Sequence, residues 1–139
     1  MVNSIHVAVG VIVNARDEVL VAYRPKNKDQ GGLWEFPGGK KEKNETIESA
    51  LQREFLEEIG IQLKSYSPML KIKHDYKEYS VVLDVWMITG YSKIPMGAEG
   101  QTVEWRQVQS LNFKDFPEAN KGIIRFLKSR GAYHSSHTS

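Results

Sequence analysis

Residues 38–61 read GGKKEKNETIESALQREFLEEIGI, and the rest of the chain is interpreted outward from this stretch. It begins with a glycine pair, continues through a charged loop, and then contains good helix formers without proline. Thr46 suits the N-cap because its side chain can accept a hydrogen bond from an early helix N–H group. Gly60 suits the left-handed position that closes a helix. We therefore predict a glycine turn followed by one amphipathic helix between Thr46 and Gly60.

Carboxylates share the apolar side of this predicted helix. At about 100° per residue, the apolar side chains fall on one arc that we expect to face the core, namely Ile47, Ala50, Leu51, Phe55 and Ile59. Glu54 and Glu58 fall inside that arc, and Glu57 falls at its edge. Buried unpaired carboxylates are costly, whereas Mg²⁺ binds carboxylates together with substrate phosphates. The spacing favours a magnesium site, and the alternatives are a solvated acidic face or a Glu paired with Arg53.

The same stretch resembles the Nudix box, in which Gly, five residues, Glu and seven residues precede Arg-Glu-apolar-x-Glu-Glu-x-Gly-apolar. Its fixed positions are all filled, in order, by Gly39, Glu45, Arg53, Glu54, Phe55, Glu57, Glu58, Gly60 and Ile61. The resemblance implies an α+β Nudix fold, a mixed β-sheet sandwiched between helices (α/β/α). It also implies that Glu54, Glu57 and Glu58 hold metal ions, with the Gly38 backbone carbonyl as a further ligand. Arg53 joins the catalytic set in a structural role, pairing with the loop Glu.

The amino-acid composition limits the classes of protein to which this chain can belong. The 139 residues are 40% hydrophobic and 26% charged, with a net charge of +2, as in a soluble globular domain. The absence of cysteine excludes disulfides, cysteine metal sites and cysteine nucleophiles. No apolar run approaches the roughly 18–20 residues of a membrane span, and the N-terminus lacks a signal-peptide pattern. The charge does not argue for duplex DNA binding. We expect a cytoplasmic monomer without stable nucleic-acid binding.

Strands are predicted on both sides of the helix. Apolar and alternating runs indicate strands at residues 5–13, 18–23, 33–36, 69–76, 79–89 and 102–108. The first should be buried on both faces and pair with the second as a hairpin. The segments between them are predicted as a flexible loop at 25–32, a connector at 61–70 with a turn at 65–68, and a loop at 90–101. A second amphipathic helix should span residues 116–129. We expect one domain over residues 1–130 and a disordered polar tail over 131–139.

The resemblance extends to the MutT type of Nudix protein, the 8-oxo-dGTP diphosphatases. The runs that carry it cover most of residues 5–130 and read HVAVGVIV, LWEFPGGK, the box, AEGQ followed by EW, and DFPEAN. The resemblance implies Mg²⁺-dependent hydrolysis of 8-oxo-dGTP to 8-oxo-dGMP and pyrophosphate, with Mn²⁺ able to substitute. In this group the Glu of the AEGQ-like run contributes to metal binding or water activation, which assigns Glu99 to the site. Without the resemblance, the sequence favours an ordinary exposed loop residue at Glu99.

Asn120, in DFPEAN, offers an amide donor and an amide acceptor side by side. Guanine presents two acceptors on its Hoogsteen edge, whereas N7 of 8-oxoguanine carries a hydrogen, so one Asn matches both groups. The resemblance assigns Asn120 to base recognition, although an Asn there could simply cap the helix. It also suggests Phe36 and Tyr76 as pocket walls and Arg24 as a nucleotide contact.

Two other functions stay open at this point. One is Nudix hydrolysis of a different nucleoside triphosphate, a dinucleoside polyphosphate or a nucleotide sugar. The other is a non-catalytic module that binds 8-oxoguanine, which would not need the complete acidic helix found in this chain.

Overall fold

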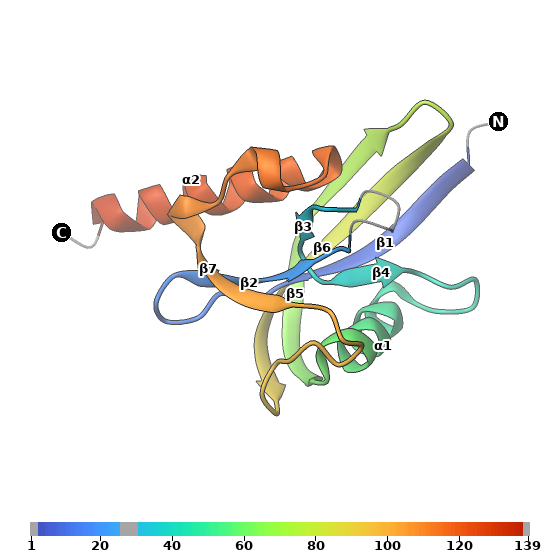
Figure 1. The fold of residues 1–139 in the computed structure, drawn as a ribbon, viewed down its shortest axis with the longest axis horizontal. Coiled ribbons are helices and arrows are strands. Elements are labelled where there is room, and N and C mark those ends of the chain that lie inside the picture. The colour runs from blue at the N-terminus through green and yellow to red at the C-terminus, as the bar shows by residue number, and fades with distance from the viewer. Residues whose placement is uncertain (1–2, 26–30, 138–139) are drawn as a thin grey trace.

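In the computed structural model, which describes residues 3–25 and 31–137, two β-sheets lie between two α-helices (Figure 1). A four-stranded sheet has the order β4-β1-β6-β5 and consists of β1 (Asn3–Val11), β4 (Gly38–Lys40), β5 (Gln62–Asp75) and β6 (Tyr79–Ser92). A three-stranded sheet has the order β3-β2-β7 and consists of β2 (Glu18–Tyr23), β3 (Trp34–Glu35) and β7 (Val103–Gln107). β1 runs parallel to β6 and antiparallel to β4, so the larger sheet is mixed.

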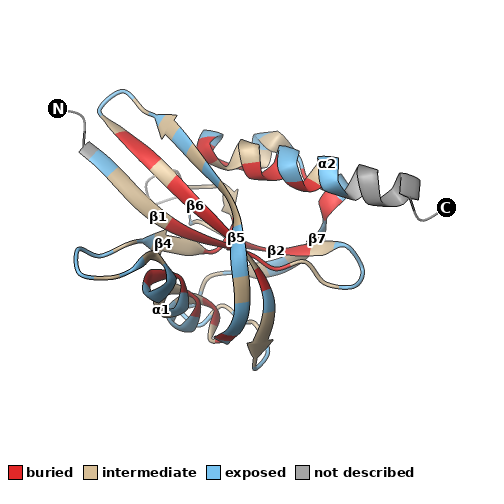
Figure 2. Cartoon of the chain, turned by 180° about the vertical axis from the view of Figure 1, so that it is seen from behind, coloured by how far each residue is buried: buried red, intermediate tan, exposed pale blue. Residues whose placement is uncertain are grey.

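The helices cover opposite sides of the strands (Figures 1 and 2). They are α1 (Ile47–Ile59) and α2 (Lys121–His137), and α2 is preceded by short 3-10 turns η1 (Val108–Ser110), η2 (Phe113–Asp115) and η3 (Glu118–Asn120). No helix in the described ranges is long and apolar enough to cross a membrane.

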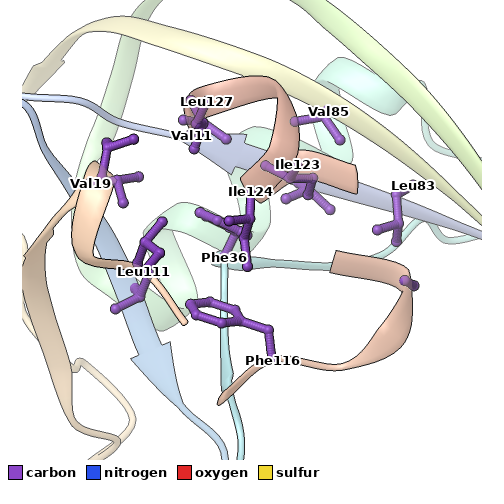
Figure 3. Close-up of a cluster of buried hydrophobic side chains, with 14 of the residues drawn as sticks. Val11, Val19, Phe36, Leu83, Val85, Leu111, Phe116, Ile123, Ile124 and Leu127 are labelled. Atoms are coloured by element: carbon purple, nitrogen blue, oxygen red, sulfur yellow. The ribbon is translucent and has the colours of Figure 1, made fainter. Parts of the chain in front are cut away.

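Alternating strand side chains supply a separate core for each helix, since successive residues of a strand point to opposite faces. Val9 and Val11 of β1 pack in the core that contains Ile123, Ile124 and Leu127 of α2 (Figure 3). Ala8 packs instead in the core that contains Leu51 and Phe55 of α1. The sheets are therefore the middle layer, and the predicted α+β sandwich with a mixed sheet is confirmed.

The predicted ends of α1 are confirmed. Thr46 Oγ1 accepts from the Ser49 N–H at 3.0 Å, and Gly60 closes the helix with a left-handed φ of 74°. The buried face also matches the predicted arc, with Ala50, Leu51, Phe55 and Ile59 inaccessible to solvent. These features depend on residues within one or two turns of each other, which is why the sequence pattern identifies them.

The predicted hairpin between the first two strands is confirmed next to its turn, where the Leu20 N–H donates to the Ile12 carbonyl at 3.1 Å, but it does not extend along β1. The chain turns at residues 14–17, and Val13 forms an antiparallel bridge with Val19. β1 itself nevertheless lies in the four-stranded sheet and β2 in the other. Residues 8–11 are buried on both faces as predicted, and such a strand needs neighbours on both edges and layers on both faces. β1 obtains its edge neighbours from β4 and β6, and the cores beneath the two helices cover its faces.

The connector and turn predicted before residue 70 are wrong, because β5 is continuous from Gln62 to Asp75. It pairs antiparallel with β6 along its length, with register irregularities between Leu63 and Ser65, Ser65 and Tyr66, and Pro68 and Leu70. β5 is an edge strand of its sheet, and an edge strand with bulges tolerates proline. Long-range pairing thus overrides the local turn signal.

Three further predicted bounds need correction. Gly38 and Gly39, predicted with Pro37 as a sharp turn, form β4 together with Lys40 and pair with β1. Residues 116–120 form irregular and 3-10 structure, so α2 begins only at Lys121. α2 then runs to His137, past the predicted end at 129 and into the predicted tail, because no proline interrupts its hydrogen bonds. Of the predicted flexible loop at 25–32, residues 26–30 lie outside the described ranges.

Candidate active site

Arg53 joins the charged loop to the C-terminal half of α1. Its Nε and Nη2 donate to the two carboxylate oxygens of Glu45 at 2.6 and 2.9 Å, and Nη2 also donates to the Lys40 carbonyl at 3.0 Å. Its Nη1 donates to Glu54 at 2.8 Å and to Glu57 at 3.4 Å. Hydrogen bonds from Arg53 are the main reason that the pKa of Glu45 is lowered to about 2. The predicted pairing of Arg53 with Glu45 is confirmed.

Glu58 points from α1 toward the start of β4, where its Oε2 accepts from the Gly38 N–H at 3.2 Å. The pKa of Glu58 is raised to about 8, mainly by burial and also by the nearby carboxylates of Glu54 and Glu35, while the hydrogen bond from the Gly38 N–H opposes these effects. Gly38 itself approaches β1 closely, since a Cβ there would lie 2.0 Å from the Ala8 carbonyl oxygen.

Glu54 lies beside Glu58 on the same face of α1. Burial raises the pKa of Glu54, and its hydrogen bond from Arg53 opposes that shift. A Cβ on Gly39 would lie 2.3 Å from the Glu54 carboxyl carbon, so only glycine lets β4 pack against this carboxylate. The helix therefore presents carboxylate oxygens in a partly buried place next to a glycine backbone.

These oxygen donors are of the kind that hard divalent cations prefer. Among the described residues, however, no three His, Asp or Glu side chains form a ready cluster for a metal ion. Arg53 forms ion pairs with two of the predicted ligands, Glu54 and Glu57. The pairing with Arg53 that the sequence left open is thus also present, and metal binding by these residues stays a prediction.

A cleft of about 540 Å³ is lined by Glu58 of α1 and by the four-stranded sheet. Gly38 is part of its lining, and strand residues of β1 and β6 form its apolar wall, namely Ile5, Val7, Val9, Val81 and Leu83. The predicted substrate residues all line the same cleft, namely Arg24, Phe36, Tyr76 and Asn120. The structure therefore brings together residues that lie far apart in the chain.

Asn120 is held in this cleft by the backbone of Phe36, whose N–H donates to Asn120 Oδ1 at 3.4 Å. The Phe36 ring is buried and stacks on Phe116, with ring centroids 5.4 Å apart (Figure 3). The hydrogen bond between Phe36 and Asn120 joins the segment between β3 and β4 to η3 across 84 residues of sequence. It places Oδ1 of the Asn120 amide toward the Phe36 backbone.

Glu99 lies in a second hollow of about 520 Å³ that shares Arg24, Glu35 and Glu58 with the cleft. Its negative charge contributes to raising the pKa of both Glu54 and Glu58, so the loop carboxylate lies near those of α1. The predicted metal and catalytic residues thus come from one helix, one glycine turn and one opposing loop.

The family follows from a comparison with known domains. Residues 8–126 match the family model described as the NUDIX domain. The chain belongs to the Nudix hydrolase family. Nudix hydrolases generally need a divalent metal ion, in keeping with the oxygen donors of α1.

Individual relatives place this Nudix hydrolase with the MutT type, as the sequence predicted. It is 36% identical over 124 residues to the 8-oxo-dGTP diphosphatase of Escherichia coli K12, covering 89% of this chain and 96% of that protein. It is 32% identical over 97 residues to the CTP pyrophosphohydrolase of the same organism, covering 70% of this chain and 72% of that protein. A MutT structure from a study of the Aliivibrio salmonicida and Vibrio cholerae proteins aligns with a TM-score of 0.79 at 34% identity, covering 92% and 99% of the two chains.

Sequence reasoning missed Glu35, which this Nudix hydrolase places in the wall shared by the cleft and the second hollow. Arg24 Nη1 donates to Glu35 at 3.4 Å, and burial raises the pKa of Glu35 against that contact. The sequence feature that could have identified Glu35 as a site residue is its position as a charged residue inside the short apolar run LWEF. Gln101 was missed as well, and nothing local in the sequence distinguishes it from an exposed loop residue.

Proposed function

We propose that this Nudix hydrolase converts 8-oxo-dGTP to 8-oxo-dGMP and pyrophosphate with Mg²⁺, as a monomer in the cytoplasm, and so removes an oxidised nucleotide before it causes mutations. One observation carries the proposal: a single cleft is lined by the α1 carboxylate Glu58, by Gly38 and by Asn120, whose amide lies next to the Phe36 backbone. Its volume of about 540 Å³ is in the range of small-molecule sites. The similarity to the E. coli 8-oxo-dGTP diphosphatase supports this substrate.

The residues that would hold the metal are Glu54, Glu57, Glu58, the Gly38 carbonyl and Glu99. When bound, Mg²⁺ would neutralise phosphate charge and lower the pKa of a bound water. Arg53 keeps the α1 carboxylates and the charged loop in fixed relative positions through its hydrogen bonds. The chemistry also needs a general base, and Glu99 on the opposing loop is our candidate for that role.

Asn120 would select the oxidised base. Its Oδ1 accepts from the Phe36 N–H and keeps a second lone pair, and its Nδ2 keeps two hydrogens to donate. These groups complement the N7–H and O6 of 8-oxoguanine. Unmodified guanine would instead set its N7 acceptor against an amide acceptor, and such a mismatch costs about 1–3 kcal/mol when buried.

Asn120→Ala is expected to lower kcat/KM for 8-oxo-dGTP by about 10- to 100-fold, which corresponds to that mismatch energy, while changing kcat/KM for dGTP much less. Steady-state kinetics on both nucleotides measure the ratio. Asn112→Ala is a matched control, because Asn112 caps η2 through the Lys114 N–H and does not line the cleft. Equal losses on both nucleotides would remove Asn120 from base selection.

The proposal is tested by chromatographic detection of the nucleotide products across a panel, with and without Mg²⁺, together with pyrophosphate release for the triphosphates. The panel contains 8-oxo-dGTP, dGTP, dCTP, CTP, a dinucleoside polyphosphate and a nucleotide sugar at low concentration. If 8-oxo-dGTP is turned over no faster than dGTP and dCTP, the oxidised-purine proposal fails. A preference for CTP would support the second candidate, pyrimidine triphosphate hydrolysis, which the similarity to the CTP pyrophosphohydrolase favours.

A further inference from the structure

The loop between β6 and β7 docks on the C-terminal end of α1. The Met96 N–H donates to the Ile59 carbonyl at 3.0 Å, and the Ala98 N–H donates to the Glu58 carbonyl at 2.8 Å. The last carbonyls of a helix have no partners within the helix, so these bonds give them partners from the loop. The loop therefore has a defined position relative to the helix that carries the box carboxylates.

Gln101 adds to this contact with both ends of its side-chain amide. Its Nε2 donates to the same Glu58 carbonyl at 3.0 Å, and its Oε1 accepts from the Glu99 N–H at 3.0 Å. Donor and acceptor of an amide have a fixed relative geometry. The backbone of Glu99 is thereby tied to the backbone of Glu58 through one rigid group.

A tight turn presents Glu99 next to this bridge. The Gly100 N–H donates to the Gly97 carbonyl at 3.1 Å, and Gly100 has a φ of 85°, which glycine adopts readily. A Cβ on Gly97 would lie 1.8 Å from the Gln101 carbonyl oxygen, so the two ends of the turn touch. Because the turn is this compact, displacing Gln101 should also displace Glu99.

We infer that Gln101 is a positioning residue: its amide sets the distance between the Glu99 turn and the end of α1, so that Glu99 and Glu58 act on the same metal-bound phosphates. This inference rests on the proposed function, in which Glu99 belongs to the site. Misplacing a reacting group by about 1 Å can cost on the order of 100-fold in rate. The bridge joins the Glu99 backbone to the end of α1, so a double variant with Glu99 separates this role from a general role in folding.

Gln101→Met keeps the length of the side chain and removes both hydrogen bonds. We expect it to lower kcat for 8-oxo-dGTP by about 10- to 100-fold and to weaken Mn²⁺ binding to the nucleotide-free protein, measured by electron paramagnetic resonance. We expect Glu99→Gln to impair both as well. Gln107→Met is the matched control, since it removes a comparable bond from Gln107 Nε2 to the Arg16 carbonyl at 3.2 Å. The melting temperature of each variant should stay within about 4 °C of the parent, as expected for losses below about 1 kcal/mol.

The double variant decides the inference. If Gln101 acts through Glu99, Gln101→Met causes no further loss of turnover or Mn²⁺ binding in a Glu99→Gln background. If the losses of the two single variants multiply in the double variant, the inference is wrong. It is also wrong if Gln101→Met behaves like the control Gln107→Met while Glu99→Gln is impaired. Either outcome leaves the proposed function intact. If Glu99→Gln changes neither turnover nor Mn²⁺ binding, the proposed roles of Glu99 and Gln101 are both wrong. If the parent hydrolyses no nucleotide in the panel, the proposed function fails, and Mn²⁺ binding alone decides the role of Gln101.

Discussion

Glu58→Gln is expected to lower kcat by about three orders of magnitude, which corresponds to roughly 4 kcal/mol of transition-state stabilisation. Glu58 is the α1 carboxylate that lines both the cleft and the second hollow, and its Oε2 faces the Gly38 backbone. Glutamine has nearly the same shape but no charge, so it would bind a divalent cation far more weakly. Single-turnover and steady-state measurements of pyrophosphate release, with Mg²⁺ varied, give the loss.

Glu48→Gln is the matched control for this change, because Glu48 is an exposed carboxylate in the first turn of the same helix. It should leave kcat within about twofold of the parent, as expected for a surface substitution away from the site. A Glu58→Gln protein with near-parental turnover would contradict a metal site at α1. The same variant addresses the non-catalytic alternative, since a module that only binds 8-oxoguanine would lose little affinity.

The metal-free protein is expected to lose on the order of 3 kcal/mol of unfolding free energy as pH rises from about 4.5 to about 8. The pKa of Glu58 is raised to about 8 in the folded protein, mainly by burial, while in the unfolded chain it is near the ordinary value of about 4.3. At a pH below both pKa values, Glu58 is protonated in the folded and in the unfolded chain, and its contribution to the free energy of unfolding is fully present. As pH rises between them, the unfolded chain releases the proton first, so folding becomes less favourable.

Denaturant unfolding in the presence of a chelator, at several pH values, measures this loss. Glu58→Gln should flatten the curve and be more stable than the parent at pH 8, although it is expected to be nearly inactive. Adding Mg²⁺ at pH 8 should stabilise the parent and have little effect on the variant. A metal-free parent whose stability rises between pH 5 and 8 would show that the Glu58 environment is not as the structure has it. Glu45 does not interfere, because its lowered pKa of about 2 affects stability only at acid pH.

Sequence alone identified those parts of the site that depend on local spacing. Helical periodicity placed Glu54 and Glu58 on the apolar arc, and the cap residues Thr46 and Gly60 gave the ends of α1. The pairing of Arg53 with Glu45 came from the family resemblance, and the structure contains it. Such predictions succeed because residues within a few helical turns are neighbours in any fold that forms the helix.

Local spacing in the sequence could not predict which strands pair with each other. The turn at 14–17 correctly suggested an antiparallel contact, but β1 pairs with β4 and β6 instead of β2. β5 continues through Pro68 because its partner β6 supplies hydrogen bonds along the edge. Which strands become neighbours depends on covering both faces of the sheet with helices, a condition that spans the whole chain.

Residues 38–61 by themselves thus determined the helix, its caps and the candidate metal carboxylates on it. Only the tertiary structure decided what surrounds them: the cleft wall from β1 and β6, the partly buried Glu35 beside Arg24, and the Gln101 bridge to the Glu58 carbonyl. The physical reason is separation along the chain. Asn120 meets Phe36 across 84 residues and Gln101 meets Glu58 across 43, and contacts at that distance are created by packing rather than by any local pattern.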